Sequence, residues 1–213
     1  MNEALRTHYQ NKIERTVRAL QRNRMDAHYV EDKDELLELL ARLVPQGAKV
    51  ASGGSATLDQ TGVYRLLMEG GYDFYYRGRA DQATGEPLDV YREAFRCDWY
   101  FTSANAITEE GELYNVDGAS NRVAAMLYGP ANVVVIAGAN KIVRDRDAAA
   151  HRVQNTAAPA NATRLERKTP CVPAGSCLDC RSEDRICCST VVQGFQREPG
   201  RIKVFLLPED LGF

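Results

Sequence analysis

Short apolar runs alternate with amphipathic helical patterns along most of this chain, and this alternation constrains the fold more than any other feature. Parallel strands need a crossover segment between them, usually a helix, whereas antiparallel strands can be joined by a tight turn. The most strongly apolar run, Asn132 to Ala137, is typical of a central strand covered on both faces. The sequence therefore predicts an α/β fold with a largely parallel sheet.

The hydrophobic spacing also predicts the individual elements. Helices are expected over residues 3–22, 36–43, 58–68, 90–95, 119–127 and 145–156. Strands are expected over residues 26–30, 49–52, 72–76, 98–107, 113–116 and 132–137, with a final edge strand over 202–206. Residues 77–87 resemble a polar loop. Three prolines (159, 170 and 173) predict that residues 157–173 are mostly not regular structure.

The size of the chain, 213 residues with 44% hydrophobic composition, suits one large domain. We expect a single domain over 1–213, with a core over about 5–165, a cysteine-rich loop over about 168–192 and a C-terminal strand over about 201–207. A net charge of −2 gives no reason to expect nucleic acid as a partner. No apolar run is long enough to span a membrane, and the polar N-terminus lacks a secretory pattern, so a cytoplasmic location is expected. The oligomeric state stays open, and a homo-oligomer is compatible with the sequence.

Five of the six cysteines fall between Cys171 and Cys188, with the spacing C-x5-C-x2-C-x6-C-C. Thiolates are soft ligands, and four of them in one loop suit an iron–sulfur cluster or zinc. A reducing compartment argues against disulfides, although disulfides and unligated thiols remain alternatives. The expected ligands are three cysteines with either Cys187 or Cys188 as the fourth, and Cys187 is our choice: Cys171, Cys177, Cys180, Cys187. Cys97 is expected to be a buried apolar residue.

A glycine turn, ASGGSATL, leads from an expected strand into an expected helix. Gly53 and Gly54 permit close backbone approach, and Ser55 and Thr57 offer hydroxyl groups, so the turn could receive an anion. The alternative is an ordinary strand-to-helix turn in which Ser55 caps the helix.

A second polar string, NVDGASNR, gathers Asn115, Asp117, Asn121 and Arg122 around Gly118. Because ligands collect at the carboxyl ends of strands in open α/β sheets, Asp117 could act as a base and Arg122 could clamp a carboxylate or phosphate. The alternative is structural, with Asp117 capping the helix and pairing with Arg122.

Polar residues also follow the central strand, where Asn140 and Lys141 occur in GANKIVRD. Lys141 offers a point charge for an anion. Glu109, in the turn before the second polar string, is a further candidate nucleophile or base, although adjacent glutamates in a turn are usually only solvated.

Five strings together resemble the LUD (lactate utilisation) domain family, formerly DUF162: GGSATL, NAITEEGELYNVDGASNRVAAMLYGP, VVVIAGANKIV, AAPANATRL and TPCVPAGSCLDCRSEDRIC. The resemblance covers about residues 5 to 190, and it is to the stand-alone branch with a cysteine tail. It implies a Rossmann-like sheet of the sugar-phosphate isomerase and coenzyme A transferase (NagB/RpiA/CoA transferase-like) superfamily. It also implies a place in a bacterial system that oxidises L-lactate to pyruvate with iron–sulfur partner proteins.

The resemblance carries three groups of residues with it. The family's glycine turn matches Gly53, Gly54, Ser55 and Thr57. Its DG-x-x-NR box matches Asn115, Asp117, Gly118, Asn121 and Arg122. Its NK box matches Asn140 and Lys141. No reaction is attached to these positions by the resemblance.

Three hypotheses about function follow, and whether the chain is an enzyme stays open. The first is a redox accessory protein or subunit that binds a small carboxylate and holds a [4Fe–4S] cluster. The second is an isomerase- or transferase-like enzyme acting on a phosphorylated or coenzyme A-linked small molecule, with a structural zinc loop. The third is a non-catalytic scaffold whose cysteines pack a lid.

Overall fold

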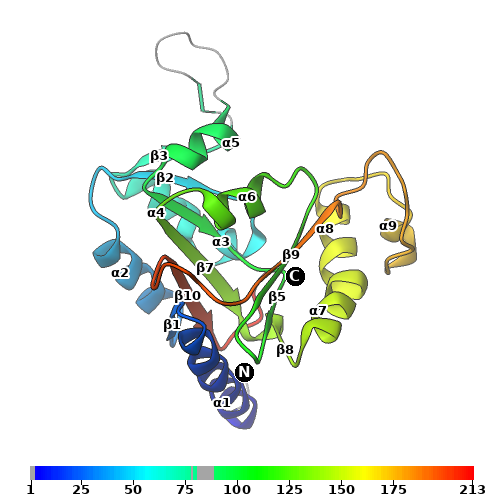
Figure 1. Ribbon diagram of the computed structural model, residues 1–213, viewed down its shortest axis with the longest axis horizontal. Coiled ribbons are helices and arrows are strands. Elements are labelled where there is room, and N and C mark those ends of the chain that lie inside the picture. The colour runs from blue at the N-terminus through cyan, green and yellow to red at the C-terminus, as the bar shows by residue number, and fades with distance from the viewer. Residues whose placement is uncertain (1–2, 78, 81–88) are drawn as a thin grey trace.

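The computed structural model describes residues 3–77, 79–80 and 89–213, and its centre is a six-stranded parallel sheet (Figure 1). The strand order is β1 (Asp26–Tyr29), β10 (Ile202–Leu207), β7 (Asn132–Gly138), β4 (Trp99–Thr102), β2 (Lys49–Ser52) and β3 (Asp73–Tyr75). Every neighbouring pair in it is parallel. The expected α/β fold with a largely parallel sheet is confirmed.

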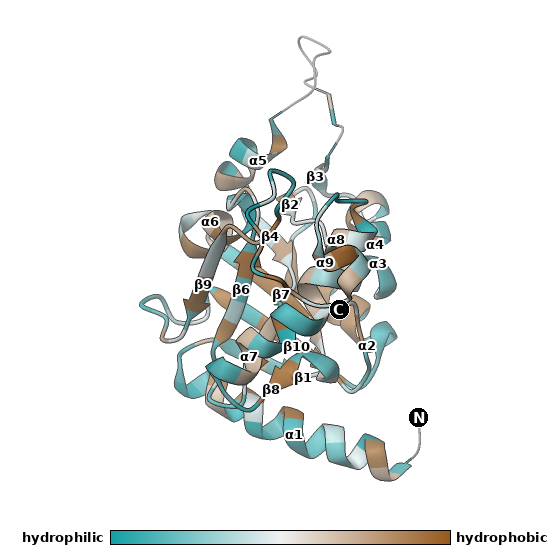
Figure 2. Ribbon diagram, turned by 90° about the vertical axis from the view of Figure 1, so that its right-hand side faces the viewer, coloured by the Kyte–Doolittle hydropathy of each residue, from teal (hydrophilic) through white to brown (hydrophobic). Residues whose placement is uncertain are grey.

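Helices cover both faces of this sheet. Figure 2 shows the mostly hydrophobic strands, in brown, between helices that carry both hydrophobic and hydrophilic residues. One face packs against α1 (Glu3–Arg22), α6 (Asn121–Tyr128) and the 3₁₀ turn η1 (Ala94–Arg96), which follows α5 (Val90–Glu93). The other face packs against α2 (Lys33–Leu43), α3 (Ala56–Gln60) and α4 (Val63–Glu69). The two apolar layers make the core, as expected for a parallel sheet.

A smaller mixed sheet lies beside the first, in the order β8 (Ile142–Val143), β5 (Ala106–Thr108), β6 (Leu113–Asp117) and β9 (Ser189–Gln193). β5 and β6 form an antiparallel hairpin, and the turn expected at Glu109 joins the two strands. β9 pairs with β6, so the chain after the cysteines is held by a ladder from Ser189 to Gln193. The sequence did not predict this second sheet.

Most element predictions are confirmed, and the local chemistry explains why. The helix over 3–22 is α1, and Asp32 caps α2 by accepting from the Glu35 backbone N–H at 2.9 Å. β7 is central and almost fully buried, as its apolar sequence requires. Cys97 is buried, and burial raises the pKa of its thiol to about 12.

Three element predictions are wrong. The helix expected over 58–68 is split into α3 and α4, because Gly62 adopts a positive φ of 76° between them. The strand expected over 98–107 is split into β4 and β5, which belong to different sheets. The strand over 202–206 is not at an edge, since β10 lies between β1 and β7. The polar loop expected over 77–87 falls mostly outside the described residues.

The segment over 157–173 is also more regular than its prolines predict. α7 (Arg146–Arg152) continues through a π-helical turn, η3 (Val153–Ala157), into α8 (Ala158–Arg164), and α9 (Cys171–Ala174) follows. Pro159 lies in the first turn of α8. Because the helix runs on from η3, the missing N–H of Pro159 leaves the Gln154 carbonyl without a helical donor, and that carbonyl instead accepts from the Cys177 backbone N–H at 2.8 Å. Within the described residues, no helix is long and apolar enough to cross a membrane.

Candidate functional site

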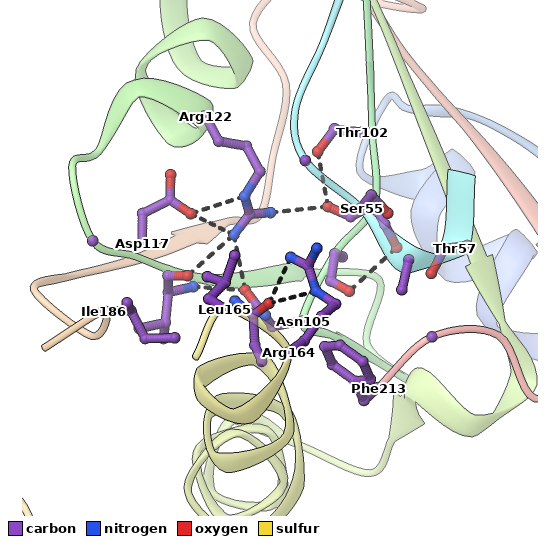
Figure 3. Close-up of a pocket in the computed structure, with 18 of the residues that line it drawn as sticks. Ser55, Thr57, Thr102, Asn105, Asp117, Arg122, Arg164, Leu165, Ile186 and Phe213 are labelled. Carbon is purple, nitrogen blue, oxygen red and sulfur yellow. Dashed lines mark hydrogen bonds and ion pairs between the residues drawn. The ribbon is translucent and has the colours of Figure 1, made fainter. Parts of the chain in front are cut away.

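A polar pocket of about 300 Å³ opens at the carboxyl ends of the central strands (Figure 3). The glycine turn after β2, the residues after β4 and the lysine after β7 all contribute to its wall. Ligands bind at this edge of open α/β sheets, because the strand ends and following loops converge there.

The charges that line the pocket are mostly positive. Among the described residues that line it, the cationic side chains are Arg77, Arg122, Lys141, Arg164 and Arg167, and the acidic side chain is Asp117. The whole chain carries a net charge of −2, so this concentration of cations is local. A cleft lined by one sign of charge raises the local concentration of counter-ions, and this pocket therefore suits a small anion.

Arg122 and Asp117 form a buried ion pair on one side of the pocket, and Figure 3 shows the two side chains facing each other. Arg122 Nε donates to Asp117 Oδ1 at 2.8 Å, and Nη2 lies 2.6 Å from the same oxygen. The other carboxylate oxygen accepts from the Val123 backbone N–H at 3.0 Å, in the first turn of α6. The pair has the geometry of the structural alternative, in which Asp117 stabilises the helix start and pairs with Arg122.

The remaining donors of Arg122 also bond to protein. Nη1 donates to the Ser103 carbonyl at 2.9 Å and to Asn115 Oδ1 at 2.7 Å. Nη2 donates to Asn105 Oδ1 at 2.9 Å and to the Val116 carbonyl at 3.2 Å. A guanidinium has five N–H groups, so these bonds use its donor capacity and leave little for a ligand. Arg122 therefore holds the break between β4 and β5 in place.

Lys141 lines the same pocket and is only 3% exposed. Its Nζ donates to Thr57 Oγ1 at 2.9 Å and to Ser103 Oγ at 3.0 Å, both of which are neutral. Burial lowers the pKa of Lys141 to about 7, and the neighbouring cations Arg152 and Arg122 contribute to the lowering. Near neutral pH this amine exists in both the charged and the uncharged form.

Arg164 comes from the end of α8 and is held differently from Arg122. Its Nε and Nη2 donate to Asn161 Oδ1 at 3.1 and 2.8 Å, and its guanidinium lies 5.9 Å from the Phe213 ring centroid. These partners are neutral, so they do not offset its charge. Arg164 is therefore better placed than Arg122 to receive the carboxylate of a ligand.

Four cysteines line a second, small cavity beside this pocket: Cys171, Cys177, Cys180 and Cys187. Its other walls include Ala158, Leu178 and Ile186. Cys188 is exposed, is not part of the lining and donates to the Arg185 carbonyl at 3.6 Å. Among the described residues the cysteines are free thiols, and no group of three or more His, Cys, Asp or Glu is arranged to hold a metal ion.

Hydrogen bonds shape the cysteine segment around its cavity. The Asp179 backbone N–H donates to Cys177 Sγ at 3.3 Å, inside the Cys177–Cys180 turn. Arg185 donates to the Cys187 carbonyl at 2.7 Å and to the Cys180 carbonyl. Burial raises the pKa of the Cys187 thiol to about 11, with a further rise from Cys177, while Arg185 opposes the rise.

The cysteine cavity and the polar pocket share a wall, because Ile186 lines both. The Cys188 backbone N–H donates to the Asp117 carbonyl at 2.8 Å, and the Ser189 and Ser120 hydroxyl oxygens lie 2.5 Å apart. Gly118 permits this approach, since a Cβ at that position would lie 3.3 Å from Ile186 Cα. The cysteine segment is thus bound to the NVDGAS string.

The structure brings most of the expected anion-site residues to one pocket. The lining includes Gly54, Ser55, Thr57, Asp117, Asn121, Arg122 and Lys141. Ser55 also caps α3, accepting from the Leu58 N–H at 3.3 Å.

Four of the expected residues are not part of that lining. Gly53 allows the Arg122 side chain to pack closely against the backbone, because a Cβ at position 53 would lie 3.2 Å from Arg122 Cδ. Asn115 is buried and accepts from Arg122, while Asn140 Oδ1 accepts from the Leu211 backbone N–H at 3.1 Å. Glu109 lies apart, 3.7 Å from Arg15 in an ion pair.

Several pocket residues were not predicted from the sequence, notably Ser103, Asn105, Arg164, Ile186 and Phe213. A signal existed for Ser103 and Asn105, because both are polar residues inside an otherwise apolar run. The other three come from segments distant in sequence, and nothing in their local pattern points to the pocket.

A sequence model of the LUD domain matches residues 13–207 of the chain. A crystal structure described as a DUF162 family protein from Deinococcus radiodurans is similar over 96% of this chain and 98% of that one, with 15% identity and a TM-score of 0.52. At that identity the likeness shows the fold alone.

Two other solved structures are similar over less of their length. A Pseudomonas malonate decarboxylase hetero-tetramer in complex with malonate matches 67% of this chain and 34% of that one, with 18% identity and a TM-score of 0.39. A variant of the decarboxylase AibA/AibB matches 49% of this chain and 58% of that one, with 16% identity and a TM-score of 0.35. Neither likeness bears on function. No curated protein matches the chain.

Proposed function

Because the chain belongs to the LUD domain family, we propose that it is an accessory protein or subunit in the bacterial oxidation of L-lactate to pyruvate. Membership of that family supports a role related to lactate utilisation. In the proposal, the pocket at the sheet edge binds a small carboxylate, and a [4Fe–4S] cluster is held by Cys171, Cys177, Cys180 and Cys187. One observation carries the proposal: four cysteines line a cavity that shares Ile186 with the polar pocket.

The donor set fits a cluster in number and in kind. A [4Fe–4S] cluster takes four thiolates, each on a different iron, so its ligands surround an inorganic core and need not meet at one point. The charge of Arg185 opposes the rise that burial causes in the pKa of Cys187, and the Asp179 N–H would keep its hydrogen bond to Cys177 Sγ when that sulfur binds iron. When bound, the cluster would supply one-electron transfer.

The polar pocket fits a small carboxylate by charge and size. Arg164 presents a cation whose hydrogen-bond partner is neutral, and Lys141, also bonded only to neutral groups, adds a second positive charge when it is protonated. Arg122 holds the wall that carries Ser103 and Asn105, and so positions the ligand indirectly. A carboxylate such as lactate or pyruvate would gain charge-assisted hydrogen bonds without displacing an existing ion pair.

The cluster is tested by iron and sulfide analysis of the protein purified and reconstituted without oxygen. The wild-type chain should hold about four irons and four sulfides. Cys187→Ala should lose most of that iron, because its sulfur lines the cavity, whereas Cys188→Ala should retain it. Cys97→Ala is a second control, being buried in the core elsewhere. Equal iron in Cys187→Ala and Cys188→Ala would contradict the ligand assignment.

A second candidate function is an isomerase- or transferase-like enzyme whose cysteine loop holds structural zinc. The buried amine of Lys141 favours it, since a lysine that titrates near neutral pH is common in enzyme sites. The same elemental analysis separates the two candidates. One zinc per chain, with no iron or sulfide after reconstitution, would support the zinc loop and exclude the cluster.

A further inference from the structure

Lys141 occupies an environment that suits a nucleophile more than a simple cationic anchor. It comes from the 3₁₀ turn η2 (Ala139–Lys141), which follows the buried central strand, and its side chain is almost fully buried. In the part of the chain that the structure describes, the charged groups that shift its pKa are Arg152 and Arg122, both of them cations, and neither offsets its charge. Such surroundings favour the neutral amine, which is the form that attacks carbon.

Two hydroxyl groups orient this amine. A neutral amine has two hydrogens and one lone pair, and the contacts of Nζ to Thr57 Oγ1 and Ser103 Oγ account for two hydrogens. The lone pair is then free to face a ligand in the pocket that Lys141 lines. The same hydroxyls lie at hydrogen-bond distance from the nitrogen, where they can relay protons.

Nearby backbone segments of the same chain hold the Lys141 amine and its two hydroxyl partners in place. Gly212 has a φ of 59°, and a Cβ there would lie 2.6 Å from Thr57 Oγ1 and 3.3 Å from Lys141 Nζ. Thr57 Oγ1 also donates to the Leu211 carbonyl at 3.3 Å. On the other side, Arg152 donates to the Asn140 carbonyl at 3.0 Å, which fixes the residue before Lys141. The amine is thus held in place rather than mobile.

We propose that Lys141 forms a reversible imine with the carbonyl group of a small 2-oxo acid whose carboxylate is bound by Arg164. This inference rests on the proposed binding of a small carboxylate in the same pocket. The Nζ lone pair forms a bond to the carbonyl carbon, and the C=O π electrons move to oxygen, which takes a proton. The resulting carbinolamine loses water, and the C=N bond of the imine remains. The step is a condensation with no change of oxidation state.

The test is reductive trapping of the full-length protein with pyruvate and cyanoborohydride at pH 7 to 8. Intact-chain mass should show one reduced pyruvyl group, and peptide mapping should place it on Lys141. L-lactate, which has the carboxylate but no carbonyl, should slow the labelling and leave no adduct. Lys141→Arg and Lys141→Met should not be labelled, while Lys33→Arg, at an exposed surface lysine, should label like the wild type.

Calorimetry with pyruvate on the same samples separates this inference from the proposed function. Pyruvate that binds without trapping on Lys141 would overturn the imine and leave the carboxylate site standing. Labels spread over surface lysines and unchanged in Lys141→Met would also overturn it. Trapping on wild-type Lys141 in a protein that holds no iron would support the imine and count against the redox proposal. Mapping of the wild-type chain keeps the test decisive even where a variant fails to fold.

Discussion

The polar pocket and the cysteine cavity are neighbours, yet they are built in different ways. The pocket draws its residues from many elements of the central sheet, and buried hydrogen bonds from Arg122 tie them together. The cavity is formed mainly by one irregular segment, residues 169–187, with Ala158 from α8. The fold itself therefore organises the pocket, whereas the cavity depends on a short loop and on whatever its sulfurs bind. The difference predicts that the two regions respond differently to substitution.

The largest expected effect is on the pocket side, in Arg122→Ala. Removing one partner of a buried ion pair leaves Asp117 with an uncompensated charge, so the free energy of unfolding should fall by about 3–5 kcal/mol. Cys177→Ala should lose bound iron but cost much less stability, because its loop lies outside the core. Chemical denaturation of both variants, prepared without iron, checks the comparison. Equal losses of stability would mean that the cavity is as much part of the fold as the pocket.

The next largest expected effect is on the affinity for the ligand and leaves the stability of the protein unchanged. Arg164→Ala should weaken binding of lactate and pyruvate by roughly ten- to hundredfold, the cost of one hydrogen bond to a charged group. Its thermal melting should stay close to that of the wild type, because its contacts are neutral and lie at the end of α8. Arg144→Ala is the matched control, an exposed arginine outside the pocket. An unchanged affinity in Arg164→Ala would leave the carboxylate without its assigned partner.

The pocket should also respond to pH through Lys141. The pKa of this amine lies near 7, so it is charged below that value and neutral above it. Affinity for L-lactate should therefore rise, by a factor on the order of ten, as pH falls through 7. The rate of trapping by pyruvate should instead rise with pH, because the neutral amine attacks. Calorimetry and labelling from pH 6 to 8 measure both trends, and Lys141→Met should remove them. Parallel trends for the two ligands would contradict the assignment.

The smallest expected effect is that of Gly118→Ala, which alters the contact between the polar pocket and the cysteine segment. The added Cβ would lie 3.3 Å from Ile186 Cα, so the cysteine segment must shift by a few tenths of an ångström. We expect a stability loss of about 1 kcal/mol and slower iron incorporation. Gly54→Ala is the control, because nothing lies within 4 Å of a Cβ at that position. If both variants behave like the wild type, the contact between loop and pocket is too loose to couple them.

Local patterns were enough to predict the parallel sheet, because strand and helix periodicities do not depend on distant residues. They also placed Ser55 and Lys141 after strands of the parallel sheet, whose carboxyl ends meet at one edge, whereas Asp117 ends β6 of the second sheet and lines the same pocket only because the two sheets pack together. They offered Asp117 as a partner for Arg122 but not its other contacts, because Asn105 and Ser103 reach it only through the break between β4 and β5.

The position of the cysteine loop could not be predicted from the sequence either. The sequence indicated a cysteine-rich loop after the core, but β9 pairs with β6 and brings Ile186 against Gly118. Strand pairing between residues so distant in the chain leaves no mark on either local pattern. Near the π-helical turn, Pro159 indicates only that a helical donor is missing, and the sequence does not show that the Cys177 backbone N–H supplies one to the Gln154 carbonyl at 2.8 Å.

The most direct test of the account is the electron paramagnetic resonance spectrum of the reduced, reconstituted protein with and without saturating pyruvate. Ile186 lines both the cysteine cavity and the polar pocket, so a ligand in the pocket should perturb the electronic environment of a cluster held by the four thiolates. The cluster signal should shift when pyruvate binds, and at the same pyruvate concentration the shift should be smaller in Arg164→Ala. A spectrum that stays identical while calorimetry shows pyruvate bound, or a protein with no cluster signal at all, would contradict it.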